Sequence, residues 1–114
     1  MPTPTDLVRA RYSAYALELS DFIMQTTHPD NEEYDSNFDN WRVRVDAYCF
    51  RNLFLGLEIV SAEDDKVSYR YEMATFFSEY ITEVKEDCVF AKFNDEWKYL
   101  SGEITSEEVL AEDD

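Results

Sequence analysis

The sequence predicts a single α+β domain in which N-terminal helices pack inside a curved antiparallel β-sheet. Apolar residues recur with the helical period of about 3.6 over roughly the first fifty residues, and with the two-residue period of a strand from Leu53 onward. The first helical segment is also apolar around much of its circumference, which a sheet that curls around it would explain. We assign residues 1–105 to this domain and residues 106–114 to an acidic C-terminal tail with one helical turn.

The first predicted helix runs from Pro4 to Thr27, the longest segment with unbroken helical periodicity. Thr3 and Asp6 have the T-x-x-D spacing of a capping box, and Pro4 suits the first turn of a helix. Arg11 lies between two apolar stripes, on the side that we expect to be buried. The first stripe contains Val8, Tyr12, Tyr15, Leu19, Phe22 and Ile23, and the second contains Leu7, Ala10, Ala14 and Leu17.

The remaining elements are shorter and are separated by polar segments. Residues 28–35 (HPDNEEYD) are polar with one proline and predict a loop. Ser36 and Asp39 have capping-box spacing and open a second helix that continues to about Phe50. Alternating apolar residues then predict strands at 53–60, 67–73 and 80–93 and a last strand that begins with residues 97–100, with turns at 62–66 and 94–95.

Side-chain alternation assigns residues to the two faces of each strand. In the third strand, Glu86 has the same phase as the apolar residues, so we expect its carboxyl group on the inner face of the sheet. The apolar phases contain Leu53, Leu55, Leu57 and Ile59 in the first strand, Val67, Tyr69, Tyr71 and Met73 in the second, and Tyr80, Thr82, Val84, Cys88 and Phe90 in the third.

Arg11 and Glu86 are charged residues at positions that point inward. An unpaired buried charge costs several kcal/mol, so each needs a partner, and each is the other's best candidate. We therefore predict that the two side chains meet inside the sheet, together with a hydroxyl group from Tyr12 or Tyr71. Two interpretations stay open: a buried ion pair that fixes helix against sheet, and the polar floor of a ligand pocket. The candidate pocket residues are Arg11, Tyr12, Tyr15, Tyr71 and Glu86.

The charge balance restricts the partners of this protein. Ten basic residues against 26 acidic ones give a formal net charge of −16, which repels nucleic-acid phosphates and anionic lipid headgroups. No apolar run approaches the roughly 20 residues of a membrane-spanning helix. Cys49 and Cys88 lie far apart and form no C-x-x-C pair, which favours reduced thiols and a cytoplasmic location.

The sequence also excludes several kinds of site. One histidine and two distant cysteines cannot form a closed zinc site, and the adjacent acidic pairs lack the spacing of a calcium loop. Glycine occurs only at positions 56 and 102, so phosphate-binding glycine loops and the G-x-S-x-G motif are absent. His28, which precedes a proline, is expected in a loop. We therefore predict no metal and no cofactor.

Two segments resemble the central domain of the YchJ family. Residues 2–29 are similar to the family's proline-rich lead, RSRYSAY core and T-x-x-P ending, and residues 85–103 to its HExSxF…W-Y-x-DG segment. Position by position, Glu86, Cys88 and Phe90 occupy the places of the family's glutamate, serine and phenylalanine. Trp97, Tyr99 and Gly102 match its closing pattern. Lys85 stands where the family has a histidine.

This resemblance implies the nuclear transport factor 2-like (NTF2-like, or cystatin-like) fold, a cone formed by a bent sheet around a helix. Domains of the YchJ family are usually flanked by cysteine-rich SEC-C motifs similar to the zinc-binding tail of the translocase SecA. The two cysteines here form no such motif, so the resemblance implies no zinc-dependent role. It also brings no established activity.

Two functions remain open from the sequence. The first is a non-catalytic module that binds a ligand or a protein, and the alternative is a small-molecule enzyme whose acidic pocket transfers protons, as in an isomerase or dehydratase. A cavity of ~300 Å³ or more that contains a carboxyl group of raised pKa would favour the enzyme. A filled interior with an aromatic outer face would favour the module. Phe76 and Phe77, placed within the sheet, predict rings on both faces and a homodimer through the outer one.

Overall fold

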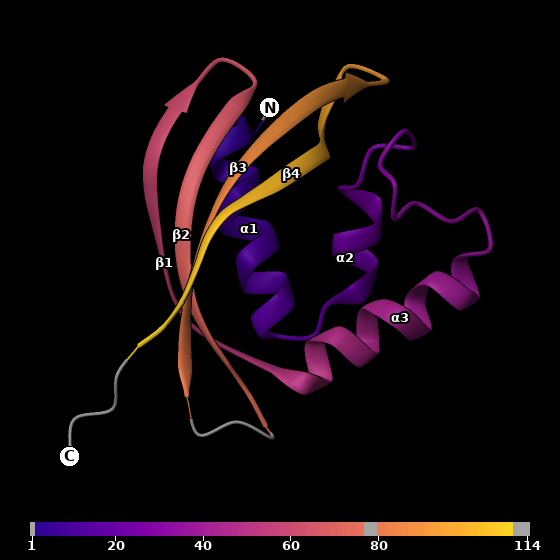
Figure 1. Ribbon diagram of the computed structural model, residues 1–114. Coiled ribbons are helices and arrows are strands. Elements are labelled where there is room, and N and C mark those ends of the chain that lie inside the picture. Colours follow the sequence, from indigo (N-terminus) through magenta and orange to yellow (C-terminus); the bar gives the residue numbers. More distant parts are fainter. Residues whose placement is uncertain (1, 77–79, 111–114) are drawn as a thin grey trace.

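The computed structural model describes residues 2–76 and 80–110, which form three helices followed by one antiparallel sheet with strand order β1-β2-β3-β4. The predicted α+β class is confirmed. Figure 1 shows a curved sheet with α1 along its concave side and with α2 and α3 covering the open side. The elements are α1 (Pro4–Ala16), α2 (Ser20–Gln25), α3 (Phe38–Arg51), β1 (Asn52–Glu63), β2 (Lys66–Thr75), β3 (Ile81–Phe93) and β4 (Glu96–Val109).

Helix α1 begins as predicted but ends early. The capping box forms, with the Thr3 hydroxyl accepting from the backbone of Asp6 and the Asp6 carboxylate accepting from that of Thr3. The single helix predicted to Thr27 is wrong, because Glu18 adopts a left-handed φ of 58°. The backbone N–H groups of Glu18 and the next residue bond the carbonyls of Tyr15 and Ala14, a Schellman ending. Residues on both sides keep the helical period, which hides this break.

Helix α3 has its cap one residue later than predicted. The side chain of Asn37 accepts a hydrogen bond from the backbone of Asn40, so the predicted cap at Ser36 is wrong by one position. Trp41, Val45 and Cys49 form the buried side of the helix. These residues pack against α1 and α2 and close one end of the molecule.

Strands β2 and β3 follow their predicted phases. Val67, Val84, Cys88 and Phe90 are among the most deeply buried side chains, each at most 2% exposed. The β2–β3 register places Tyr69 directly opposite Glu86. The carboxyl group of Glu86 therefore lies on the inner face of the sheet, as the alternation predicts.

Strand β1 changes phase along its length. The pairing with β2 skips Leu55, which is the extra residue of a β-bulge. Leu57 packs into the core beyond this bulge, but Leu53 and Leu55 are exposed and Phe54 contacts the rings of the interior instead. The predicted common face of Leu53, Leu55, Leu57 and Ile59 is therefore wrong in its first half.

Strand β4 is longer than predicted. Asn94 and Asp95 form the predicted tight turn, both with left-handed φ, and the strand then continues from Glu96 to Val109. Residues 106–109 are therefore strand and not a helical turn, because they pair with the start of β3. The predicted tail residues 111–114 lie outside the described part of the chain, and a domain boundary at residue 105 stays a prediction.

Phe76, the first residue of the predicted aromatic pair, does not sit in the middle of the sheet. Phe76 follows the end of β2, and its ring contacts Phe50 of α3 with 5.9 Å between centroids, whereas Phe77 lies outside the described residues. The outer face near the middle of the sheet carries ion pairs, in which Arg70 contacts Glu58 at 3.1 Å and Glu83 at 3.0 Å. The observation behind the predicted dimer is thus weakened, and self-association stays a prediction.

Candidate functional site

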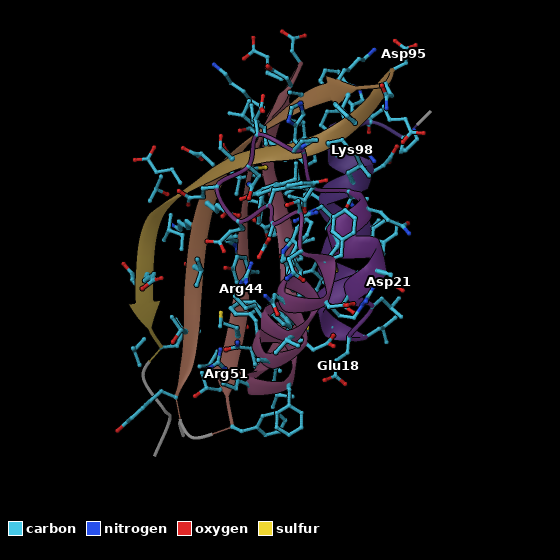
Figure 2. The ribbon with its side chains drawn as sticks, turned by 90° about the vertical axis from the view of Figure 1, so that its right-hand side faces the viewer. Glu18, Asp21, Arg44, Arg51, Asp95 and Lys98 are labelled. Atoms are coloured by element: carbon cyan, nitrogen blue, oxygen red, sulfur yellow. The ribbon has the colours of Figure 1, made fainter. Side chains whose placement is uncertain are left out.

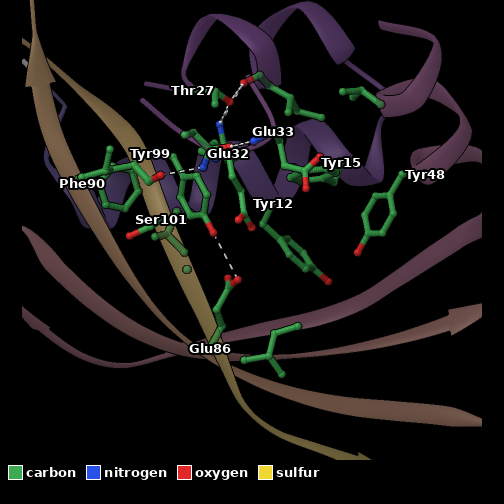
Figure 3. Close-up of a pocket in the computed structure, with 18 of the residues that line it drawn as sticks. Tyr12, Tyr15, Thr27, Glu32, Glu33, Tyr48, Glu86, Phe90, Tyr99 and Ser101 are labelled. Atoms are coloured by element: carbon green, nitrogen blue, oxygen red, sulfur yellow. Dashed lines mark hydrogen bonds between the residues drawn. The ribbon is translucent and has the colours of Figure 1, made fainter. Parts of the chain in front are cut away.

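A cavity of about 780 Å³ lies between the concave face of the sheet and the helices that cover it (Figure 3). All three helices, the loop after α2 and all four strands contribute to its wall. Pockets for small molecules typically have volumes of about 300–1,000 Å³. Aromatic rings form much of the wall, and they come from Tyr12, Tyr15, Trp41, Tyr48, Phe54, Tyr69, Tyr71, Phe90 and Tyr99.

The residues that the sequence groups as a pocket floor line this same cavity. Helix α1 contributes three of them, and β2 and β3 contribute one each. The side chains that the helical and strand periodicities predict to point inward therefore all line one cavity. Ligand binding by these residues stays a prediction. The five residues are Arg11, Tyr12, Tyr15, Tyr71 and Glu86.

Glu86 and Tyr99 form the polar centre of the cavity. The Tyr99 hydroxyl donates a hydrogen bond to Oε1 of Glu86, with 3.3 Å between the oxygens. In Figure 3, Glu86 reaches from β3 toward Tyr99 on β4. Tyr12, Tyr15 and Tyr48 lie to the right of this pair in the same view. Within residues 2–76 and 80–110, Glu86 forms no other hydrogen bond and no ion pair. Its Oε2 is therefore available to a donor from outside.

Tyr99 is held in place from several directions. Its backbone N–H donates to the carbonyl of Thr26 at 2.8 Å, and its carbonyl accepts from the backbone of His28 at 2.8 Å. These bonds form a parallel bridge between Tyr99 of β4 and Thr27, in the segment that follows α2. The Arg11 guanidinium lies 4.6 Å from the centre of the Tyr99 ring, and Phe90 packs edge-on at 5.8 Å. The hydroxyl that meets Glu86 is therefore positioned before any ligand binds.

The predicted ion pair between Arg11 and Glu86 is not formed. Nη1 of Arg11 donates instead to the carbonyl of Ile23 at 3.0 Å, and to the hydroxyls of Thr26 at 2.7 Å and Thr27 at 3.2 Å. These acceptors lie at the end of α2, where helix carbonyls lack intrahelical partners. The break after α1 turns α2 back along α1, and this brings the acceptors within reach of the buried guanidinium.

Tyr99 and Gly102 are site residues that the pocket prediction omitted. A Cβ atom on Gly102 would lie 2.1 Å from the Tyr99 hydroxyl and 2.6 Å from Oε1 of Glu86, so only glycine leaves room for the pair. Strict alternation would place residues 99 and 102 on opposite faces. A register shift in the β3–β4 pairing instead sets Tyr99 opposite Phe90 and Gly102 opposite Cys88, on one face. The available sequence signal was their match to the W-Y-x-DG pattern.

The cavity raises the pKa of Glu86 above its ordinary value of 4.5. Burial is the main cause, because it disfavours the charged carboxylate, and the hydrogen bond from Tyr99 and the charge of Arg11 only partly offset it. Burial likewise raises the pKa of Tyr99 and Tyr48, and the nearby charge of Glu86 adds to both shifts. The site thus combines a protonatable carboxyl group with neutral hydroxyl groups.

Two tyrosines from α1 shape the wall beside this pair. The Tyr12 ring packs edge-on against Phe54 at 5.9 Å, and Tyr15 packs edge-on against Tyr48 at 5.7 Å. The Tyr12 hydroxyl is enclosed without a hydrogen-bond partner in the described structure. Burial raises the pKa of Tyr12, and the backbone of Gly56 partly offsets this shift.

The rim of the cavity carries both signs of charge. The buried Asn31 side chain donates to the carbonyl of Leu100 at 2.7 Å and ties the loop after α2 to β4. This loop brings Asp30, Glu32 and Glu33 to the rim, where the close-up view labels the last two (Figure 3). Across from them, α3 contributes Arg44 and Arg51, which Figure 2 shows on the side of α3 toward the sheet. The acidic residues that this loop contributes to the rim are thus Asp30, Glu32 and Glu33.

Neither a metal cluster nor a membrane-spanning helix is found in the described ranges. No three side chains of the histidine, cysteine, aspartate or glutamate type lie together as metal ligands in residues 2–76 and 80–110. His28 closes a turn in the loop, as its Nδ1 accepts from the backbone of Asp30 at 3.0 Å. None of the helices in the same ranges has the length and apolar character to cross a bilayer.

The curved sheet, the helix that it encloses and the cavity between them define a domain of the NTF2-like class. Residues 3–102 match the family described as YchJ, middle NTF2-like domain. This match covers most of the chain, and the chain therefore belongs to the YchJ family. The fold and the family that the sequence predicts are both confirmed.

Relatives of the chain are bacterial proteins named UPF0225. One from Deinococcus radiodurans is 33% identical over 101 residues, which are 87% of this chain and 68% of the relative. One from Vibrio parahaemolyticus is 32% identical over 112 residues (93% and 62%), and one from Photorhabdus laumondii is 26% identical over 106 residues (88% and 64%). The chain thus spans slightly less than two thirds of the latter two. No solved structure matches significantly.

Proposed function

We propose that this domain binds a small organic molecule in its cavity, with the Glu86–Tyr99 pair as the polar anchor. One observation carries the proposal: a carboxyl group lies inside a ring-lined cavity of about 780 Å³ and keeps one oxygen free of protein partners in the described structure. Ligand pockets typically combine a mostly apolar wall with a few converging polar groups. A filled interior, which would favour a protein-interaction module, is not what the fold contains.

Energetics also support a binding role for Glu86. A partly buried carboxyl group that lacks full hydrogen bonding lowers stability, and an apolar side chain at this position would avoid that cost. Burial raises the pKa of Glu86, because the surroundings of the carboxyl group disfavour its charged form. A ligand that donates a hydrogen bond to Oε2 would offset the cost, and Tyr99 already fixes the other oxygen.

A fragment screen by ¹H–¹⁵N NMR tests this proposal. We expect hits whose chemical-shift changes cluster at the amides of cavity residues such as Tyr71, Glu86 and Tyr99, and spare Arg70 on the outer face. Glu86→Gln should weaken polar hits, whereas Glu103→Gln, an equal change of charge at an exposed site, should not. A library of several hundred fragments without a single hit that maps to the cavity would contradict the proposal.

A proton-transfer enzyme is the second candidate, and the raised pKa of Glu86 favours it. A general base works best when its pKa is near the working pH, and burial moves Glu86 in that direction. In such a reaction Glu86 would remove a proton from a carbon next to a carbonyl group. The Tyr99 hydroxyl would leave Glu86 and donate to the substrate oxygen as negative charge develops there.

Deuterium exchange separates the two candidates. Each cavity-binding fragment with an acidic C–H group would be incubated with the protein in D₂O and followed by ¹H NMR. Loss of that proton signal with the wild type, but not with Glu86→Gln, would support an enzyme. Bound fragments that keep their C–H signals through long incubation would support a binding module.

We also propose a cytoplasmic location. Cys49 and Cys88 are both free thiols and both buried, and burial raises their pKa to about 11 and about 12. Unpaired, unreactive cysteines are typical of a reducing compartment. Fractionation of the source cells checks this, and recovery of the protein outside the cytoplasmic fraction would contradict it. The homodimer predicted from the sequence is a separate question, and light scattering at high protein concentration tests it.

A further inference from the structure

We propose that the ligand is a small organic cation, a protonated amine on an apolar body, whose ammonium group binds Oε2 of Glu86. This inference rests on the proposed function, because it names the class of molecule that the same cavity binds. Three features of the wall carry it: a carboxyl group without a cationic partner, aromatic rings beside that group, and acidic residues at the entrance.

In the described part of the chain, none of the three arginines that line the cavity forms an ion pair with Glu86. Arg11 donates to three oxygens at the end of α2 and stacks on the Tyr99 ring, so it forms no ion pair with Glu86. Arg44 at the rim pairs with Asp35 at 3.2 Å. Arg51 lines the cavity from the last residue of α3 and is exposed to solvent. A ligand ammonium group would therefore be the first cation to contact the carboxyl group directly.

Aromatic rings flank the place where the ammonium group would sit. Tyr69 is the direct cross-strand neighbour of Glu86, and its ring stacks near that of Tyr71 with 6.1 Å between centroids. Tyr15 and Tyr48 line the same cavity as Glu86. Ring faces attract cations through their quadrupoles, and most strongly where water is excluded.

The charges at the entrance of the cavity also favour a cationic ligand. The rim carries three acidic residues, Asp30, Glu32 and Glu33, against two arginines, of which Arg44 pairs with Asp35, and the whole chain has a formal net charge of −16. Such a field concentrates cations at the cavity and repels anions. An anionic ligand would also place its charge next to Glu86, which is unfavourable in a partly buried site.

Three probes that share one body and differ in charge test this inference. They are 2-phenylethylamine (cation), 2-phenylethanol (neutral) and 3-phenylpropanoate (anion), titrated into the full chain at pH 7.5 and low salt with ¹H–¹⁵N NMR. We expect the amine to bind about tenfold or more tightly than the alcohol, since charge-assisted hydrogen bonds are the stronger kind, and the anion to bind weakest. Comparable dissociation constants for amine and alcohol would overturn the inference.

Two variants assign the preference to its residue. Glu86→Gln should reduce the amine-to-alcohol ratio to about twofold or less and leave the alcohol nearly unchanged, because the neutral amide keeps the shape of the site. Glu103→Gln, the matched loss of one exposed charge, should keep the wild-type ratio. An unchanged ratio in Glu86→Gln would overturn the inference. If that variant does not fold, the wild-type series decides alone.

The outcomes also separate this inference from the proposed function. Cavity binding by the alcohol, without preference for the amine, would overturn the cationic ligand and keep the binding function. Failure of all three probes to shift cavity amides would overturn the cationic ligand as stated. The fragment screen would then decide independently whether the cavity binds small molecules at all.

Discussion

The hydroxyl oxygen of Tyr99 lies 3.3 Å from Oε1 of Glu86, in space that exists because residue 102 has no side chain. A Cβ atom there would approach these two oxygens to 2.1 Å and 2.6 Å, which is closer than non-bonded atoms tolerate. Gly102 is thus part of the site without contributing a functional group. The geometry of the polar centre depends on three residues from two neighbouring strands.

Replacing Gly102 with alanine should separate Tyr99 from Glu86. We expect a loss of stability of about 1–3 kcal/mol, the usual effect of forcing extra volume into a filled space. Urea unfolding measures the loss, and NMR titration with a cavity-binding fragment measures the effect on binding. Gly56→Ala is the matched control, because a Cβ atom there would meet nothing within 4 Å. Equal behaviour of the two variants would contradict the close approach at Gly102.

Local patterns predicted the parts of the fold that local energetics decide. The Thr3–Asp6 capping box depends on residues three apart, and the inward phase of Glu86 follows from alternation in an undisturbed strand. The family resemblance, now confirmed, supplied the bent sheet that encloses the helix. Together these features brought the five predicted pocket residues to one cavity.

Features that depend on an irregularity elsewhere escaped prediction. The partners of Arg11 belong to α2, whose direction is set by the left-handed residue Glu18. Tyr99 and Gly102 share a face only because a register shift interrupts β4 between them. Neither break leaves a mark in hydrophobic periodicity, since the residues around each one continue the same pattern.

Arg11→Met should destabilise the fold by about 2–4 kcal/mol. The substitution removes a buried charge together with its hydrogen bonds to the end of α2, and it frees one face of the Tyr99 ring. Urea unfolding checks the value, and Arg9→Met, on the exposed side of α1, is the control with about 0.5 kcal/mol or less. A stable Arg11→Met variant that loses only fragment binding would show a purely functional role for this arginine.

Stability should depend on pH through Glu86 in a defined direction. The folded-state pKa is raised, so the folded protein holds this proton more readily than the unfolded chain. The resulting stabilisation is fully present below the ordinary value of 4.5 and is lost as the pH rises through the raised pKa. Relative to wild type, Glu86→Gln should therefore gain stability between pH 4 and pH 8.

Subtracting the two urea-unfolding curves at each pH isolates Glu86 from the other acidic groups. The difference should grow with pH and then level off. A flat difference, or one that falls with pH, would contradict a raised pKa. The charged and titratable groups that face or adjoin Glu86 are Arg11 and Tyr15 on α1, Tyr48 on α3, Tyr69 on β2, Asp87 and Cys88 on β3, and Tyr99 on β4.

Glu18→Gly should stabilise the protein by about 0.5–1 kcal/mol, because glycine adopts the left-handed conformation without the steric cost of a Cβ atom. Glu18 is exposed and has a φ of 58° at the Schellman ending of α1, so its side chain contributes little packing that could be lost. Glu18→Ala is the control: it removes the carboxylate but keeps the Cβ atom, and it should give no comparable gain. Urea unfolding of the three proteins measures both effects. Equal stability of the glycine and alanine variants would show that the backbone of residue 18 is not strained. A gain confined to the glycine variant would show strain at the turn that directs α2 toward Arg11.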